Sequence, residues 1–179
     1  MKGIFIVAAK RTPFGAFGGS LKALSATDLG VISTKAALEQ GKIDPATVDA
    51  VFFGNVIQSC PDAAYLARHV GLKSGIPIPT PALTINRLCG SGFETVIQGA
   101  NAIRVGDANI ALCGGAENMS AAPLQASGND VRWGVNLGSG LALRDALWDG
   151  LTDTYKNTPM GITAENLAEQ YNITRQVSA

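Results

Sequence analysis

Strand-like and helix-like patterns alternate up to about residue 113, and this alternation restricts the fold more than any other feature of the sequence. Strand patterns are expected at about 3–9, 49–58, 80–88 and 108–113, and helical patterns at about 27–40, 63–73 and 91–105. Strands that alternate with helices pair in parallel through helical crossovers. We therefore predict an α/β fold with a mainly parallel sheet, whose ligands bind at the carboxyl ends of the strands.

The alternation breaks between about residues 120 and 158, a stretch rich in Gly, Asn and Asp. Long irregular stretches inside a compact domain are usually functional lids or disordered. The break predicts two domains, an α/β domain over residues 1–119 and a partial, truncated loop or lid domain over residues 120–179. Trp133 and Trp148 are expected to anchor a small core of the second domain, with packing against ligand as the alternative.

Shorter helical patterns cover residues 141–148 and 164–171. Thr174 is then a good N-cap for another helix, of which only a few residues follow. A helix start without its helix is typical of a truncated chain, and we expect truncation here.

Cys89 lies at the corner where the third strand pattern meets the third helical pattern. Backbone N–H groups of a first helical turn lie close to such a corner, and Gly90 and Gly92 leave room for another molecule to approach. These conditions favour a nucleophile over the alternative, a small buried hydrophobic residue. A helix N-terminus stabilises an anion by only about 0.3–1 kcal/mol, so a full nucleophile also needs a base, normally His.

The residues around Cys89, Asn86-Arg87-Leu88-Cys89-Gly90-Ser91-Gly92, resemble the segment of the thiolase family that carries the acylated Cys. Further segments match that family in the same order: Arg11–Gly15, Gly54–Val56, Ala67–Arg68, Gly114–Ser120 and Met160–Asn166. The resemblance runs from about residue 3 to the last residue. Within the family it is greatest to the mitochondrial 3-ketoacyl-CoA thiolases, through Tyr65–Leu72 and Pro159–Met160. Short-chain acetoacetyl-CoA thiolases commonly have His where this chain has Pro159.

The resemblance implies a thiolase-like N-terminal domain, with a mixed, mainly parallel sheet and an inserted loop domain. It implies an acyltransferase that cleaves 3-ketoacyl-CoA to acetyl-CoA and a shortened acyl-CoA through an acyl-enzyme on Cys89. The Cys89 N–H would then be one oxyanion donor, and Met160 would line the acyl pocket as a substrate-binding residue. Coenzyme A is expected as a substrate, and neither a cofactor nor a metal is expected.

Motifs that thiolases carry in their C-terminal half do not occur in this sequence: an Asn-Glu-rich motif, Gly-His-Pro, and Cys-x-Gly-Gly-Gly. They supply the base, part of the oxyanion site and a second Cys. The only His, His69, lies in a helical pattern and is expected at a helix surface or partly buried. We interpret the chain as the N-terminal half of a thiolase, with the C-terminal half absent and the chain inactive alone. The alternatives are a non-catalytic fragment that dimerises and an acetoacetyl-CoA-specific biosynthetic thiolase.

The resemblance further implies a homodimer or homotetramer, in which the edge strand Leu83–Leu88 pairs across a two-fold axis. It also implies the mitochondrial matrix, with cytoplasm and peroxisome left open. The formal net charge is zero and the pI about 6.6, without a basic stripe, so nucleic acid is not expected as a partner. No apolar stretch is long enough to span a membrane.

Three residues near these motifs carry separate expectations. Cys113 ends an apolar run and is expected in the core, whereas Cys60 precedes Pro61 in a loop and is expected to have no role. Three cysteines without metal-ligand spacing suit free thiols in a reducing compartment. Glu117 is interpreted as a structural hydrogen-bond partner rather than a catalytic acid. Gly114 and Gly115 are expected to permit close packing near the site.

Overall fold

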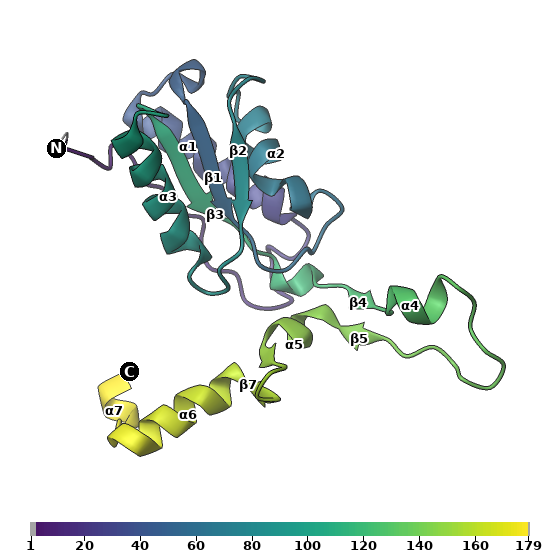
Figure 1. The fold of residues 1–179 in the computed structure, drawn as a ribbon. Coiled ribbons are helices and arrows are strands. Elements are labelled where there is room, and N and C mark those ends of the chain that lie inside the picture. The colour runs from purple at the N-terminus through teal and green to yellow at the C-terminus, as the bar shows by residue number, and fades with distance from the viewer. Residues whose placement is uncertain (1–2, 179) are drawn as a thin grey trace. The chain divides into compact units, whose positions relative to one another are not determined.

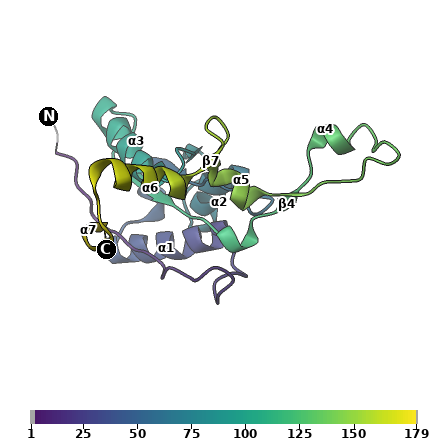
Figure 2. The ribbon, with the colours of Figure 1, turned by 90° about the horizontal axis from the view of Figure 1, so that it is seen from below.

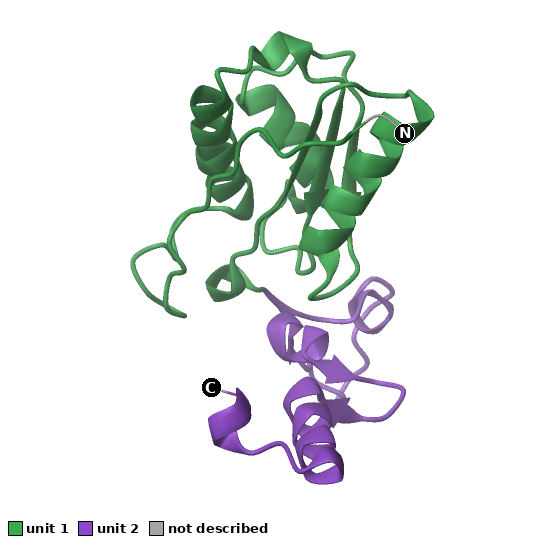
Figure 3. Ribbon diagram, turned by 90° about the vertical axis from the view of Figure 1, so that its left-hand side faces the viewer, with its two compact units in different colours: residues 1–122 green, residues 123–179 purple. Residues whose placement is uncertain are grey.

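The computed structural model describes residues 3–178. The chain divides between Ala122 and Pro123 into two compact units (Figure 3). Unit 1 ends at Ala122 and contains the α/β alternation. Unit 2 begins at Pro123 and contains the irregular stretch and the last helices.

The sheet of unit 1 has three parallel strands in the order β2-β1-β3 (Figure 1). They are β1 (Ala50–Gly54), β2 (Ala82–Ile85) and β3 (Ala111–Gly115). Phe53 of β1 lies opposite Thr84 on one side and Gly114 on the other. Three of the predicted strands are therefore confirmed, each shorter than its pattern. Because the strands are parallel, the segments that follow them leave the sheet at one edge.

The strand predicted at residues 3–9 is wrong, because this stretch has no regular secondary structure. Phe5, Ile6 and Val7 are 81%, 81% and 69% exposed. A strand needs a neighbour for its backbone groups, and β1 is the one strand of the described sheet that pairs on both sides. Residues 3–9 have the alternation of apolar residues that a strand requires, but no strand of the described sheet pairs with this segment.

Two helices cover one face of the sheet and one covers the other (Figures 1 and 2). They are α1 (Ala26–Gly41) and α2 (Leu66–Lys73) on one face, and α3 (Ser91–Val105) on the other. Glycines mark the closest approaches. A Cβ on Gly30 of α1 would lie 3.2 Å from the Phe53 ring, whereas a Cβ on Gly99 of α3 would meet Cys113 Sγ.

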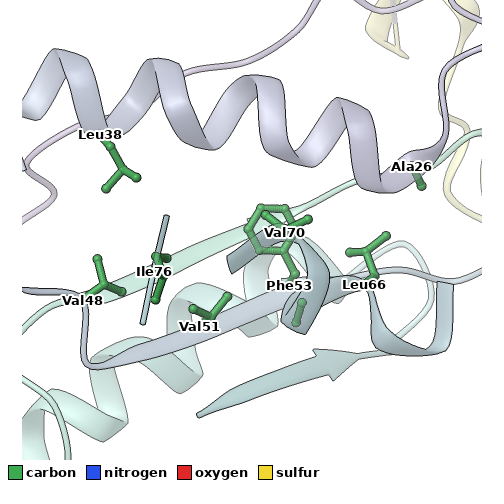
Figure 4. Close-up of a cluster of buried hydrophobic side chains, with 9 residues drawn as sticks. Ala26, Leu38, Val48, Val51, Phe53, Leu66, Val70 and Ile76 are labelled. Carbon is green, nitrogen blue, oxygen red and sulfur yellow. The ribbon is translucent and has the colours of Figure 1, made fainter. Parts of the chain in front are cut away.

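The core of unit 1 lies between the sheet and the α1/α2 layer (Figure 4). Its buried members are Ala26, Leu38, Val48, Val51, Phe53, Leu66, Ala67, Val70 and Ile76. The opposite face is less closed, because α3 leaves Phe93, Val96 and Ile97 77%, 50% and 46% exposed. The sheet face under α1 and α2 is thus covered by a closed core. On the opposite side, α3 presents apolar side chains on its outer surface.

Side chains cap helix α1 and two of the 3-10 turns of unit 1. Ser25 and Asp28 form a reciprocal capping box at the start of α1, which satisfies two helix N-terminal donors. The 3-10 turn η1 (Pro45–Thr47) is capped by Asp44. A second 3-10 turn, η2 (Ala63–Tyr65), leads into α2, and a third, η3 (Met119–Ala121), follows β3.

Unit 2 consists of short elements. Two antiparallel ribbons pair β4 (Leu124–Gln125) with β5 (Arg144–Asp145) and β6 (Thr152–Asp153) with β7 (Thr158–Pro159). The helices are α4 (Gly128–Val131), α5 (Ala146–Gly150), α6 (Met160–Tyr171) and α7 (Arg175–Ser178). The helix predicted after Thr174 is confirmed as α7. The pattern at residues 141–148 predicted α5 too early.

The expected tryptophan core of unit 2 is wrong. Trp133 is 83% and Trp148 60% exposed, and none of residues 123–178 is buried. The elements of this unit are two to twelve residues long, too short to enclose two large rings. Over the described part of the chain, no helix combines the length and apolarity needed to cross a membrane.

Candidate active site

Cys89 is exposed at the corner between β2 and α3, as the sequence predicted. The residue before it, Leu88, has a left-handed backbone with φ 48°. Such a conformation costs a non-glycine residue of the order of 1–3 kcal/mol and persists only where the surroundings enforce it. The corner is therefore held in place by other contacts.

Asn86 and Ser91 supply those contacts. Leu88 N–H donates to Asn86 Oδ1 at 3.0 Å. Ser91 Oγ donates to Leu88 O at 2.6 Å and accepts from Arg87 N–H at 2.8 Å. Ser91 is only 5% exposed, so its hydroxyl ties the strained peptide to the buried side of α3.

The glycines of the corner have different roles. A Cβ on Gly92 would meet nothing within 4 Å, so the approach expected there is open. A Cβ on Gly54 of β1 would lie 2.8 Å from Ser91 Cβ. Gly54 therefore lets the start of α3 press against the end of the central strand.

The N–H groups of the corner are less available than the sequence suggested. Gly90 N–H donates to Arg87 O at 3.1 Å, and Ser91 N–H donates to Leu88 O at 3.0 Å. These two bonds close a turn around Cys89. The first helical turn is therefore partly occupied by the corner itself.

Among residues 3–178, no side chain hydrogen-bonds to Cys89 Sγ. The only His of the chain, His69, lies in α2, where Nδ1 is 3.1 Å from Asp62 Oδ2 and the ring stacks on Tyr65 at 5.7 Å. The expectation that His69 lies at a helix surface or is partly buried is confirmed, since its side chain is half-buried. A base for Cys89 does not come from His69 in this arrangement.

Glu117 lies beyond the end of β3 and receives three hydrogen bonds. Asn55 Nδ2 donates to Oε1 at 2.8 Å, Val56 N–H to Oε2 at 2.9 Å, and Ile57 N–H to Oε1 at 3.3 Å. Burial raises the pKa of Glu117, against the lowering effect of these donors. The interpretation of Glu117 as a structural hydrogen-bond partner is confirmed.

The remaining residues singled out in the sequence have structural surroundings. Burial raises the pKa of the half-buried Cys113 thiol, consistent with its expected place in the core. Burial also raises the pKa of Cys60, and this thiol hydrogen-bonds to Asp62, so Cys60 does have a partner. Gly114 does permit close packing, since a Cβ there would lie 2.5 Å from the Phe53 ring.

Met160 is the first residue of α6 in unit 2, and it is half-buried. Its N–H donates to Leu151 O at 3.0 Å, which joins the helix start to the turn after α5. Its contact with an acyl group stays a prediction. Within residues 3–178 no group of three or more His, Cys, Asp or Glu side chains could hold a metal ion.

Sequence reasoning missed the residues that build the corner: Asn55, Asn86 and Ser91. Asn55 and Asn86 each follow directly on a strand, and Asn55 is 5% exposed. For these two residues, a polar side chain at the carboxyl end of a parallel strand was the available signal.

The chain matches the family model described as "Thiolase, N-terminal domain" over residues 4–179. It is 56% identical over 176 residues to the mitochondrial 3-ketoacyl-CoA thiolase of Rattus norvegicus, an alignment that covers 98% of the chain and 44% of the relative. It is 44% identical over 176 residues to the acetyl-CoA acetyltransferase of Cupriavidus necator, again with 98% and 44% covered.

Solved structures give the same result. The crystal structure of human mitochondrial 3-ketoacyl-CoA thiolase in complex with CoA superposes with a TM-score of 0.91 at 57% identity. The superposition covers 97% of the chain and 43% of that protein. The Bacillus anthracis acetyl-CoA acetyltransferase superposes with a TM-score of 0.86 at 39% identity, over 95% of the chain and 42% of that protein. The chain thus spans less than half the length of the relatives that it matches.

Proposed function

The chain belongs to the thiolase family, and from this membership we propose that it supplies Cys89 as the acylated residue of a CoA-dependent acyltransferase. The proposed reaction is cleavage of a 3-ketoacyl-CoA to acetyl-CoA and an acyl-CoA shortened by two carbons. The observation that carries the proposal is the exposed thiol of Cys89 at a strained strand-to-helix corner.

In the first step the Cys89 thiolate attacks the 3-keto carbonyl carbon. The tetrahedral oxyanion collapses, the C2–C3 bond breaks, and its electron pair leaves as the enolate of acetyl-CoA, which takes up a proton. The acyl group is then held as a thioester on Cys89. In the second step the thiolate of free CoA attacks this thioester and releases Cys89.

In the first step, residues of this chain hold the Cys89 thiol in an exposed position. Asn86 and Ser91 fix the peptide of Leu88, and the space around Gly92 is open, since a Cβ there would meet nothing within 4 Å. The base and the second oxyanion donor are proposed to come from a C-terminal thiolase half, because His69 is engaged by Asp62. We therefore propose negligible turnover for the chain alone.

Substrates and partners follow from the same membership. Acyl-CoA and CoA are the proposed substrates, no cofactor is proposed, and Met160 is the proposed contact of the acyl group. A homodimer or homotetramer is proposed, with β2 as the pairing edge, since β2 pairs with β1 alone in the described sheet. The proposed location is the mitochondrial matrix, a proposal supported by the similarity to the mitochondrial 3-ketoacyl-CoA thiolases of rat and human.

The test is complementation. The chain is mixed or co-expressed with the C-terminal half of the human mitochondrial 3-ketoacyl-CoA thiolase, and thiolytic cleavage of 3-ketoacyl-CoA is measured. We expect activity only with both halves, and mass spectrometry should place the acyl group on Cys89. Loss of one member of a cooperative catalytic set costs several orders of magnitude, so Cys89→Ala should abolish turnover.

Cys60→Ala and Cys113→Ala are the matched controls and should keep the thioester at Cys89. An acyl group on Cys60 or Cys113 with Cys89 unmodified would refute the proposal. A preference for acetoacetyl-CoA over longer 3-ketoacyl-CoA substrates would favour the biosynthetic alternative. Association of the chain with itself or with the C-terminal half, without any acylation or turnover, would favour a non-catalytic fragment that dimerises.

A further inference from the structure

We infer that the carboxylate of Glu117 is a positioning residue for Cys89 and acts through the segment Asn55–Ile57 and the side chain of Asn86. The inference deepens the proposed function, since it rests on Cys89 as the acylated residue. It assigns to Glu117 a part in the geometry of the thiol without any contact with substrate.

Glu117 fixes the segment that follows the central strand. Its two carboxylate oxygens accept from Val56 N–H, Ile57 N–H and Asn55 Nδ2 at 2.9, 3.3 and 2.8 Å. Asn55 Nδ2 also donates to Ala116 O at 3.0 Å, and Asn55 N–H donates to Ile85 O at 3.1 Å. The ends of all three strands therefore converge on this segment.

Asn86 continues the path from that segment to the corner. Its Nδ2 donates to Val56 O at 3.2 Å, and its Oδ1 accepts from Leu88 N–H at 3.0 Å. The peptide group that joins Val56 to Ile57 thus lies between the two residues. Its N–H donates to Glu117, and its carbonyl oxygen accepts from Asn86. Leu88 is the residue with φ 48° that directly precedes Cys89.

A carboxylate suits this place better than an amide. Three donors point at Glu117, and the carboxylate offers only acceptors to them. In Glu117→Gln one oxygen becomes an NH2 group, which would face either Val56 N–H or the Asn55 and Ile57 donors. The buried donor left without a partner disfavours the observed position of the segment, and the strained Leu88 peptide then loses part of its support.

The chain offers a matched control at the opposite end of the same sheet. Asp49 precedes β1, and its Oδ2 accepts from Asn109 N–H at 2.7 Å and Ile110 N–H at 3.0 Å. It is therefore also a carboxylate that binds two consecutive backbone N–H groups beside the sheet. Asp49 lies before the strands begin, whereas Cys89 follows their ends, so Asp49→Asn should leave Cys89 unaffected.

The test is alkylation of the whole chain by iodoacetamide, in which the thiolate displaces iodide. Rates at Cys89, Cys60 and Cys113 are followed together by peptide mass spectrometry, with folding of each variant verified by its thermal transition. A helix N-terminus favours an anion by a factor of about two to five when it is correctly placed. We expect Glu117→Gln to slow alkylation of Cys89 by about this factor, with the rates at Cys60 and Cys113 unchanged.

Asn86→Ala, at the exposed end of the path, should also slow alkylation of Cys89. This variant replaces Glu117→Gln in the test if Glu117→Gln does not fold. Because both residues act through Val56, the double variant should be no slower than the slower single variant, whereas Asn86→Ala with Asp49→Asn should equal Asn86→Ala alone. An unchanged Cys89 rate in Glu117→Gln would overturn the inference. So would faster alkylation of Cys113, since this would show general loosening of the unit.

The two proposals can fail separately. Slower alkylation of Cys89 in Glu117→Gln, without any acyl transfer to Cys89 in the complementation test, would remove the proposed function and keep the positioning path. Acylated Cys89 with an alkylation rate insensitive to Glu117 would keep the function and remove the path.

Discussion

Unit 1 and unit 2 hold their shapes in different ways. Unit 1 buries a cluster of apolar side chains between its sheet and the α1/α2 layer, with Leu66 and Val70 fully buried. Unit 2 has no buried residue over positions 123–178. Its short ribbons and helices are joined by local hydrogen bonds, such as Met160 N–H to Leu151 O. The proposed nucleophile therefore rests on a packed scaffold, and the proposed acyl-pocket residue does not.

This contrast matters for catalysis, because a reacting group must be held within a fraction of an ångström. Cys89 meets that condition through unit 1 alone, by means of Ser91 and the segment beyond β1. Met160 stands on α6, whose face is largely exposed within the described unit. Substitutions placed in pairs, one in each unit, test the contrast directly.

The largest effect is expected from loss of a buried side chain in unit 1. Leu66→Ala removes a fully buried group of α2 and should lower the free energy of unfolding by about 2–5 kcal/mol. Leu167→Ala in α6 removes a side chain that is 47% exposed and should cost about 0.5 kcal/mol or less. Urea denaturation followed by circular dichroism measures both.

Equal costs for the two leucines would contradict the contrast. A large cost at Leu167 in particular would mean that α6 is buried in solution, as it would be by another copy of the chain. Light scattering on the same samples shows whether the chain associates.

Much of unit 1 could be predicted from its sequence, because its patterns are produced by its own packing. The helix faces that pack on Val51 and Phe53 recur with helical spacing, and the capping and turn residues agree with them. The strand predicted at residues 3–9 failed for a physical reason. Alternation of apolar residues indicates a pleated, half-buried surface, but it does not provide the neighbouring strand.

Within the candidate site, Cys89 could be predicted from the sequence, but the residues that hold it in place could not. Cys89 was identified from its corner and its glycines, but the left-handed Leu88 was not, since nothing local in a Leu favours φ 48°. Glu117 and Asn55 lie 62 positions apart and Val56 and Asn86 lie 30 apart. Such contacts depend on strand order and register, which the patterns of single elements do not determine.

A smaller effect is expected from added volume at glycines. Gly54→Ala in β1 places a Cβ 2.8 Å from Ser91 Cβ, and overpacking of this kind costs about 1–3 kcal/mol. Gly161→Ala in α6 meets nothing within 4 Å and should stabilise by up to about 1 kcal/mol through helix propensity. Thermal unfolding compares the two variants, and a neutral Gly54→Ala would show that α3 can move away from β1 at no cost.

The smallest effect is expected from a partly buried carboxylate in unit 1. Hydrogen bonds from the Cys60 thiol and the His69 ring lower the pKa of Asp62 from 3.8 to about 2, with a further contribution from Lys73. A lowered pKa means that the folded state binds the proton less tightly than the unfolded state. Asp62 therefore stabilises the fold fully above pH 3.8, and this stabilisation is lost as the pH falls through about 2.

Asp62→Asn should consequently cost about 1–2 kcal/mol at neutral pH, after allowance for partial exposure of the side chain. The difference from the unsubstituted chain should shrink below pH 3.8 and vanish near pH 2. Asp149→Asn in unit 2 is the matched control, because Asp149 pairs with an Arg144 side chain that is 65% exposed, and such surface pairs contribute about 0–1 kcal/mol. Urea midpoints measured from pH 2 to pH 7 provide the comparison. An equal cost of Asp62→Asn at pH 2 and pH 7 would show that the ionised carboxylate does not stabilise the contact between α2 and the loop before it. The difference in stability between the two units would then come from apolar packing alone.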